Sequence, residues 1–266
     1  MIDALVVPPG KPAHLRDRDP GDKLGLDKAA ALPRLARLLE QLAMLQQGLY
    51  AESTRSVLLL LQGLDASGKD GVVRSVFNGV NPQGCRAVSF KAPTSTELAH
   101  DYLWRIHAAL PARGEIGIFN RSQYEDVVTA RVDELAPEKV WRRRSHHIRE
   151  WERMLSDEGT TVVKVFLNVS KEKQRERLQE RIDNPEKRWK FQTDDLIARR
   201  HFDDYLNAYD EVLTETSTDW SPWHVVPADH NWLKALAVAQ LLVTALEKMD
   251  PRLPPPDPAL DGTVVN

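Results

Sequence analysis

The chain has 266 residues, enough for one large α/β domain or two small ones. Its 36 basic and 39 acidic side chains give a net charge of −3, so no overall basic excess points to a nucleic-acid partner. The single cysteine, Cys85, excludes an intramolecular disulfide framework and a cysteine-based zinc site. No apolar run suggests a membrane span and the N-terminus does not resemble a secretion signal, so we expect a cytoplasmic protein without a membrane partner.

The predicted elements alternate between strands and helices after an N-terminal arm. Residues 1–26 are rich in proline, glycine and charge, and we expect them to form an irregular arm. From Asp27, a candidate N-cap, to Tyr50, leucines recur at helical spacing and predict a helix with one apolar face. Strands are then predicted at 56–62, 85–90, 115–120, 160–169 and 223–228. Further helices are predicted at 69–79, 96–110, 137–159, 171–182, from the end of a charged segment (183–195) to about 215, and at 231–249.

This alternation predicts an α/β fold. Strands that alternate with helices form βαβ units, which give a parallel sheet covered by helices on both faces, and hence three α/β/α layers. The sequence shows neither an internal repeat nor a linker that would separate a second domain. We therefore expect a single domain at 27–250, followed by a proline-rich C-terminal tail at 251–266 that lies outside the core.

The segment GLDASGKDG, residues 63–71, follows the apolar run SVLLLLQ and carries the first chemical signal. Its glycines and lysine match the spacing G-x-x-x-x-G-K of a phosphate-binding loop between a strand and a helix. Backbone N–H groups of such a loop hold phosphate oxygens, and the lysine neutralises their charge. The predicted phosphate contacts are Gly63, Ala66, Ser67, Gly68, Lys69, Asp70 and Gly71.

Two carboxylates lie inside this loop, although its task is to hold anions. Asp70 stands where the motif usually has Ser or Thr, whose hydroxyl binds Mg²⁺. Carboxylates are suitable ligands for a hard cation, and negative charge is also favoured at the start of a helix. We expect Asp65 to bind a metal ion and Asp70 to cap the helix.

A second cluster, FNRSQYEDV (119–127), lies at the end of the third predicted strand. In an open α/β sheet the ligand crevice lies beyond the carboxyl ends of the strands. Asn120 stands where phosphate-loop enzymes usually carry a metal-binding Asp, and it can hydrogen-bond to phosphate or nucleotide without adding charge. Arg121 can span phosphate oxygens and stabilise developing charge. The alternative is that Asn120 and Arg121 belong only to a turn and helix cap.

Basic residues in two further segments are candidate phosphate ligands. Lys187, Arg188 and Lys190 surround Trp189 in NPEKRWKF, a pattern typical of a mobile basic lid and also of a solvated basic loop. Lys91 lies just past the second predicted strand, at the expected mouth of the crevice.

Taken together, these motifs resemble the type-2 polyphosphate kinases. GLDASGKDG, GVNPQGCRAVSFKAPT, GIFNRSQYEDV, NPEKRWKF and STDWSPWHVVPADHNW match in order, and the resemblance runs from about residue 30 to residue 248. It implies a phosphate-loop kinase fold related to thymidylate kinase, with a helical lid at about 183–200. It also implies Mg²⁺- or Mn²⁺-dependent phosphoryl transfer between inorganic polyphosphate and nucleotides, in either direction, by a homodimer or homotetramer.

The resemblance assigns roles to individual residues. It implies a catalytic group of Asp65, Lys69, Asn120 and Arg121, with Asp65 as the metal ligand, and a lid of Lys187, Arg188 and Lys190 flanked by Arg181 and Asp195. The nucleotide contacts we expect are Asn120, Arg121, Tyr124 and Glu125. Members that act on monophosphates usually carry Asn in the second cluster, so Asn120 implies AMP and ADP as acceptors, with guanine as a further candidate base.

Two other functions use the same features. An ordinary ATP-dependent nucleotide or small-molecule kinase shares the fold, and site chemistry has to separate the two. Asp70 in place of Ser or Thr, together with the charged lid, argues against it. A non-catalytic module that binds polyphosphate or nucleotide is the other alternative, and the presence of both Lys69 and Arg121 argues against that one.

Overall fold

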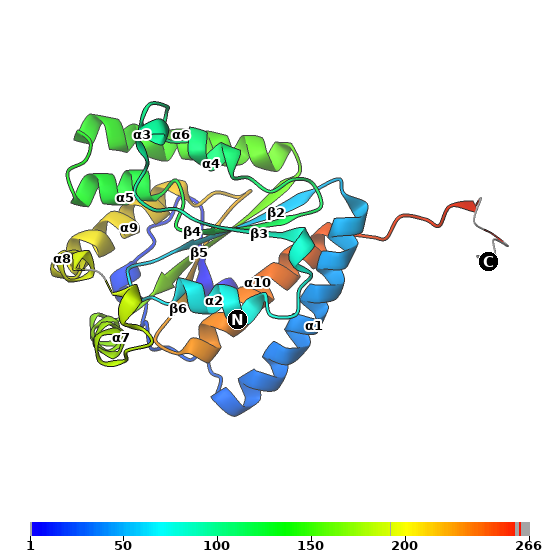
Figure 1. The fold of residues 1–266 in the computed structure, drawn as a ribbon, viewed down its shortest axis with the longest axis horizontal. Coiled ribbons are helices and arrows are strands. Elements are labelled where there is room, and N and C mark those ends of the chain that lie inside the picture. Colours follow the sequence, from blue (N-terminus) through cyan, green and yellow to red (C-terminus); the bar gives the residue numbers. More distant parts are fainter. Residues whose placement is uncertain (1, 192, 259–260, 262–266) are drawn as a thin grey trace.

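In the computed structural model, which describes residues 2–191, 193–258 and 261, a six-stranded sheet lies between two layers of helices (Figure 1). The strand order is β1-β6-β5-β2-β4-β3. Every pair of neighbouring strands is parallel except β1 and β6, which are antiparallel. The predicted α/β fold is therefore confirmed, with one antiparallel edge strand. The strands are β1 (Val6–Val7), β2 (Ser56–Gln62), β3 (Cys85–Ser89), β4 (Ile116–Asn120), β5 (Thr160–Asn168) and β6 (Trp223–Pro227).

Helices cover both faces of the sheet, and two further helices lie near the carboxyl ends of the parallel strands (Figure 1). One face is covered by α1 (Lys28–Glu52), α2 (Lys69–Val76) and α10 (Asn231–Met249). The other face carries α5 (Glu125–Val132), α6 (Glu138–Asp157) and α9 (Phe202–Thr216), with the short α3 (Ser95–Leu98) and α4 (Trp104–Ala108) beside α6. Near the carboxyl ends of the strands lie α7 (Lys171–Asp183) and α8 (Asp194–Arg200).

The central strand shows why the core forms where it does. All seven residues of β2 are buried, as expected for a continuous apolar run in a parallel sheet with helices on both faces. α1 begins where predicted, because the Asp27 side chain accepts a hydrogen bond from the Ala30 N–H. Among the described residues, no helix is both long enough and apolar enough to cross a membrane.

The N-terminal arm is more ordered than the irregular segment expected. Its residues Val6 and Val7 form β1, which pairs with His224 and Trp223 of β6. Val7 is fully buried, and the Arg18 guanidinium donates a hydrogen bond to the Val6 carbonyl (2.9 Å). The arm therefore covers one edge of the sheet, which protects backbone groups that would otherwise remain unpaired.

Three helix predictions differ from the structure. The helix expected at 96–110 is two short helices, α3 and α4, because the Asp101 carboxylate accepts from the Leu103 N–H (2.9 Å) and forms a turn between them. The helix expected at 69–79 ends at Val76, before Gly79 with its φ of +94°. The helix expected from the end of the charged segment to about 215 is two helices, α8 and α9, which meet at His201. Helix α5 was not predicted. The C-terminal tail expected at 251–266 lies partly outside the described residues, and 251–257 have no regular secondary structure.

Candidate active site

The two strongest sequence motifs meet at the carboxyl end of the sheet. Leu61 of β2 is in register with Asn120 of β4, and the Arg121 N–H donates to the Leu61 carbonyl (3.0 Å). The loop that follows β2 and the segment that follows β4 therefore lie side by side. This is the position at which open α/β sheets bind their ligands.

The phosphate loop, residues 63–69, depends on two glycines. Gly63 has a φ of +143°, and a Cβ there would lie 2.7 Å from the Leu167 carbonyl oxygen. Gly68 has a φ of +99°, which favours glycine, and it is the N-cap of α2. Ala66 also has a left-handed φ, of +61°. These dihedrals fold the chain into a tight loop that ends on the N-terminus of α2, where backbone N–H groups attract anions.

Lys69, the first residue of α2, is buried against the loop that precedes it. Its ammonium donates to the carbonyl oxygens of Gly63 (2.5 Å) and Leu64 (3.3 Å). Burial, followed by repulsion from Arg121, lowers the pKa of Lys69 to about 8, and the charge of Asp65 partly offsets both effects. A bound anion would be strongly attracted here, because the positive charge is shielded from water.

Asp65 and Arg121 form an ion pair across the two motifs, with 2.5 Å between Asp65 Oδ1 and an Arg121 terminal nitrogen. Burial alone would raise the pKa of Asp65, but the charges of Arg121 and Lys69 hold it below its usual value. Arg121 has a φ of +63°, an uncommon conformation for a residue with a side chain. Backbone strain of this kind concentrates at functional sites. The pair fixes an ionised carboxylate and a guanidinium at the mouth of the loop.

Asp70 does not cap α2 with its side chain, contrary to our expectation. The N-cap is Gly68, and Asp70 lies in the first turn, where its carboxylate accepts a hydrogen bond from the Asn120 amide (2.6 Å). Asp70 thus connects α2 to the end of β4. The contact requires a donor at position 120, which the neutral amide supplies and a carboxylate would not.

Tyr124, predicted to contact the nucleotide, has its side chain in the core. Its side chain is fully buried, and its hydroxyl donates to Glu152 of α6 (2.7 Å) and accepts from Lys164 of β5 (3.3 Å). Gln123 also donates to Glu152 (3.2 Å). The Tyr124 side chain therefore anchors the segment behind Arg121 in a buried polar network.

Glu125, another predicted nucleotide contact, lies close enough to Arg121 for their charges to interact. It is half-buried, accepts from the Thr129 hydroxyl (2.9 Å) and contributes with Asp65 to raising the pKa of Arg121, against the lowering effect of burial. The buried Tyr209 hydroxyl of α9 also lies 3.4 Å from Glu125. The guanidinium of Arg121 is thus held between two carboxylates.

The predicted lid cations lie in the segment that follows α7. The Lys187 ammonium donates to Glu180 (2.5 Å), and Arg188 Nε donates to the Ile182 carbonyl (3.0 Å). Lys190 lies half-buried over the Trp189 ring, 5.1 Å from its centroid. In this conformation the three cations are not brought onto the phosphate loop.

Arg181 and Lys91 differ in their relation to the loop. Arg181 pairs with Asp195 of α8 (3.6 Å), and its charge helps to lower the pKa of Asp65, so it faces the site. Lys91 is exposed beyond β3, where its backbone carbonyl accepts from Arg105 (2.8 Å).

Three residues that were not among the predicted site residues hold the loop from its outer side. From α7, Gln174 donates to the Asp65 carbonyl (3.1 Å), and Arg177 donates to the carbonyls of Ala66 (3.0 Å) and Ser67 (3.1 Å). From α10, Lys234 donates to the Ser67 carbonyl (2.9 Å). The signal for Lys234 was present in the sequence, because it is a lone charge in NWLKALAVAQLL, a helix segment that is otherwise apolar on most sides.

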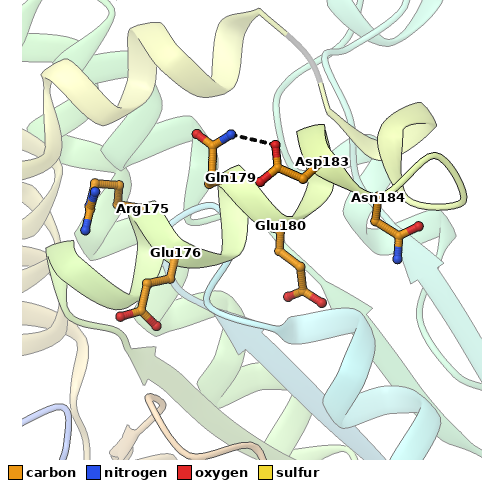
Figure 2. A pocket seen from close by; sticks show the side chains of 6 residues that line it. All are labelled: Arg175, Glu176, Gln179, Glu180, Asp183 and Asn184. Carbon is orange, nitrogen blue, oxygen red and sulfur yellow. Dashed lines mark hydrogen bonds between the residues drawn. The ribbon is translucent and has the colours of Figure 1, made fainter.

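A shallow hollow on the other face of α7 is separate from this site. Figure 2 shows its lining, in which the Gln179 amide donates to Asp183 (2.8 Å). The lining residues are Arg175, Glu176, Gln179, Glu180, Asp183 and Asn184. Helical spacing places Gln174, Arg177 and Arg181 on the opposite face of α7, toward the loop. The helix therefore presents one face to solvent and one to the phosphate loop.

The side chains of this site suit a metal ion that is bound partly by the protein and partly by the phosphates of the substrate. Among the described residues, no group of three or more His, Cys, Asp and Glu side chains could hold a metal ion. Mg²⁺ is commonly held by one or two carboxylates together with substrate phosphates and water. The ionised Asp65 carboxylate beside the phosphate loop fits that arrangement.

A phosphate loop with a buried lysine, next to an ionised carboxylate and an arginine at the carboxyl end of a parallel sheet, defines a phosphate-loop phosphotransferase. Comparison with known proteins is more specific. The model of the family "Polyphosphate kinase 2 (PPK2)" matches residues 25–254. The chain belongs to this family, which confirms the resemblance drawn from its motifs.

Individual relatives cover 83% to 98% of the chain. The chain is 51% identical over 262 residues to an AMP/ADP-polyphosphate phosphotransferase of Meiothermus ruber, covering 98% of each protein. It is 47% identical over 233 residues to an ADP-polyphosphate phosphotransferase of Rhodopseudomonas palustris, covering 83% of this chain and 81% of that one. The crystal structure of polyphosphate kinase 2 from Arthrobacter aurescens superposes with a TM-score of 0.92 at 42% identity, covering 96% of this chain and 92% of that chain.

Proposed function

We propose that this protein transfers phosphoryl groups from inorganic polyphosphate to AMP and ADP. The observation that carries the proposal is the 51% identity, over 98% of the chain, to a protein named for this reaction. In the first reaction, an oxygen of the AMP phosphate attacks the terminal phosphorus of the chain. The bond between the last two units breaks, and the products are ADP and a polyphosphate one unit shorter.

This phosphoryl transfer requires alignment of the two substrates and stabilisation of negative charge on the transferred phosphate. The attacking group is a phosphate oxygen that is already ionised, so no general base has to remove a proton from it. In phosphoryl transfer the protein therefore acts mainly by aligning the two phosphates and neutralising the charge on the transferred group. The phosphate loop, Lys69 and Arg121 are placed to do this, and the Asp70–Asn120 contact fixes the wall of the crevice beside them.

We propose Mg²⁺ or Mn²⁺ as the cofactor, held by Asp65 and substrate phosphates. The cation would neutralise charge on the phosphates that approach the loop. Asp65 is suited to this role because Arg121 and Lys69 keep it ionised. A metal ion between carboxylate and phosphate also explains how a loop that binds anions tolerates two carboxylates of its own.

We further propose a basic lid at about 183–200, in which Lys187, Arg188 and Lys190 close over the phosphate chain, and we keep Lys91 as a candidate at the crevice mouth. Closure would bring the lid cations from the segment after α7 to the loop and exclude water during transfer. The reverse synthesis of polyphosphate, the use of guanine nucleotides, a homodimer or homotetramer, and a cytoplasmic location are proposals that rest on the family resemblance.

Nucleotide chromatography tests the proposed reaction directly. The protein is incubated with long-chain polyphosphate and Mg²⁺, with AMP in one sample and ADP in another. We expect ADP and ATP from AMP, and ATP from ADP. Product from ADP alone would contradict AMP as an acceptor. No product from either, together with transfer from ATP to another acceptor, would favour an ordinary ATP-dependent kinase, and nucleotide binding without any turnover would favour a non-catalytic module.

The Asn120→Asp variant tests the choice of acceptor. An aspartate would place a second carboxylate against Asp70, at the position where Asn120 now donates a hydrogen bond over 2.6 Å. We expect activity with AMP to fall by about tenfold or more while activity with ADP falls less, since a lost bond to a charged group has an effect of this order. The measurement is kcat/KM for each acceptor. An equal loss with both acceptors would show that Asn120 does not select between them.

A further inference from the structure

Lys234 is a buried cation on the outer side of the phosphate loop, away from Asp65 and Arg121. Only 2% of its surface is exposed, although it belongs to a helix whose neighbouring residues are apolar. Its nitrogen donates to the Ser67 carbonyl (2.9 Å) and lies 2.0 Å from the place that a Cβ on Gly68 would occupy. A charged group is costly to bury, so its presence against the loop needs a reason.

Arg177 contacts the same stretch of loop from another element. One of its terminal nitrogens donates to the carbonyls of Ala66 and Ser67, and the other donates to the carbonyls of Ala228 (2.7 Å) and Asp229 (3.1 Å). The guanidinium fork therefore joins the loop to the turn between β6 and α10. Lys234 follows that turn, and it donates to the same Ser67 carbonyl as Arg177, so the two cations together hold the loop.

These contacts determine where the loop presents its N–H groups. A peptide group is planar and trans, so its C=O and N–H point in opposite directions. The carbonyls of Asp65 and Ser67 accept hydrogen bonds on the outer side, from Gln174 and from the two cations. The N–H groups of Ala66 and Gly68, which belong to the same peptide groups, are thereby turned toward the phosphate side.

The positive charges around the loop also favour the binding of a phosphate chain. The groups that face the Lys234 ammonium are Arg177 of α7, Asp229 of the turn before α10, and Lys69 of α2. Burial, followed by repulsion from Arg177, lowers the pKa of Lys234 to about 7. Three cations around one loop repel each other, and a phosphate chain bound on its inner side would relieve that repulsion.

We propose that Lys234 and Arg177 are positioning residues for phosphoryl transfer, which clamp the Ser67 carbonyl of the phosphate loop so that the Gly68 N–H faces the substrate. The proposal rests on the proposed function. Gln174 extends the clamp toward the lid, because its carbonyl oxygen accepts from Arg199 of α8 (2.9 Å) while its amide donates to Asp65. The residues of the clamp do not touch the reacting atoms, and they act through the backbone of the loop.

The test is the affinity for tripolyphosphate, measured by titration calorimetry in the full-length protein. In Lys234→Met the side chain keeps its length and loses its charge and donor. We expect the dissociation constant to rise by about tenfold or more, as for loss of a hydrogen bond from a charged group, with the melting temperature unchanged or higher. Lys248→Met, an exposed lysine of the same helix, is the control and should bind as the wild type does.

Two variants at position 177 keep the test decisive if Lys234→Met fails to fold. Arg177→Gln should weaken tripolyphosphate binding, and Arg177→Lys, which keeps the charge, should restore part of it. Wild-type affinity in Lys234→Met, or in Arg177→Gln, would overturn the clamp. If the wild-type protein binds tripolyphosphate but transfers nothing to AMP or ADP, the proposed function is wrong. The clamp is then still tested by the tripolyphosphate affinities of the variants.

Discussion

Replacement of Lys69 by methionine is expected to lower kcat for phosphoryl transfer by about two to three orders of magnitude, the usual effect of removing one group that stabilises transition-state charge. The Lys69 ammonium lies beside the loop backbone, bonded to Gly63 and Leu64, and burial keeps it from water. A short movement of this flexible side chain brings it onto a bound phosphate, and no other lysine occupies the loop.

The same variant should keep its fold. Methionine has nearly the length of lysine, and the lowered pKa of Lys69, about 8, shows that its charge is disfavoured by burial. We therefore expect a melting temperature equal to or above that of the wild type, measured together with the rate by nucleotide chromatography. Lys28→Met, at the exposed start of α1, is the matched control and should leave both values unchanged. A rate within tenfold of the wild type would show that Lys69 is not the lysine that neutralises the transferred phosphate.

Those parts of the fold that have a local signature were predictable from sequence. β2 is a continuous apolar run because both of its faces are covered, and this pattern is visible without a structure. The phosphate loop is visible because Gly63 and Gly68 are required by backbone geometry. β1, by contrast, has two residues, too few for a periodic pattern, and it forms only because the arm packs against β6.

Within the site, the limits of prediction follow from side-chain direction and strand register. Tyr124 belongs to the same motif as Arg121, yet its hydroxyl is bonded to Glu152 in the core, because neighbouring residues of a turn point to different sides. The contact between Asp70 and Asn120 depends on the register of β2 and β4, which no local pattern encodes. Lys234 lies far along the chain from the loop it supports, and only its isolation among apolar residues marks it.

The Asp65→Asn variant is expected to lower kcat by about a hundredfold or more and to raise the Mg²⁺ concentration needed for half-maximal rate. Asparagine keeps the size of the side chain and an oxygen that accepts from Arg121, so the substitution removes mainly the charge. That charge is what a divalent cation needs from the protein, since the remaining ligands come from phosphates and water. The measurement is the rate as a function of Mg²⁺ concentration at saturating polyphosphate and AMP.

Arg121→Lys separates the two roles that Asp65 has in this site. Lysine keeps a positive charge beside Asp65 but lacks the guanidinium fork that spans phosphate oxygens, so kcat should fall while the Mg²⁺ requirement stays as in the wild type. Arg86→Lys, on the exposed side of β3, is the control and should behave as the wild type does. If Asp65→Asn and Arg121→Lys lose similar rates and both keep the wild-type Mg²⁺ requirement, Asp65 acts only by holding Arg121, and its assignment as the metal ligand is wrong. A raised requirement in Asp65→Asn alone places the cation on this carboxylate.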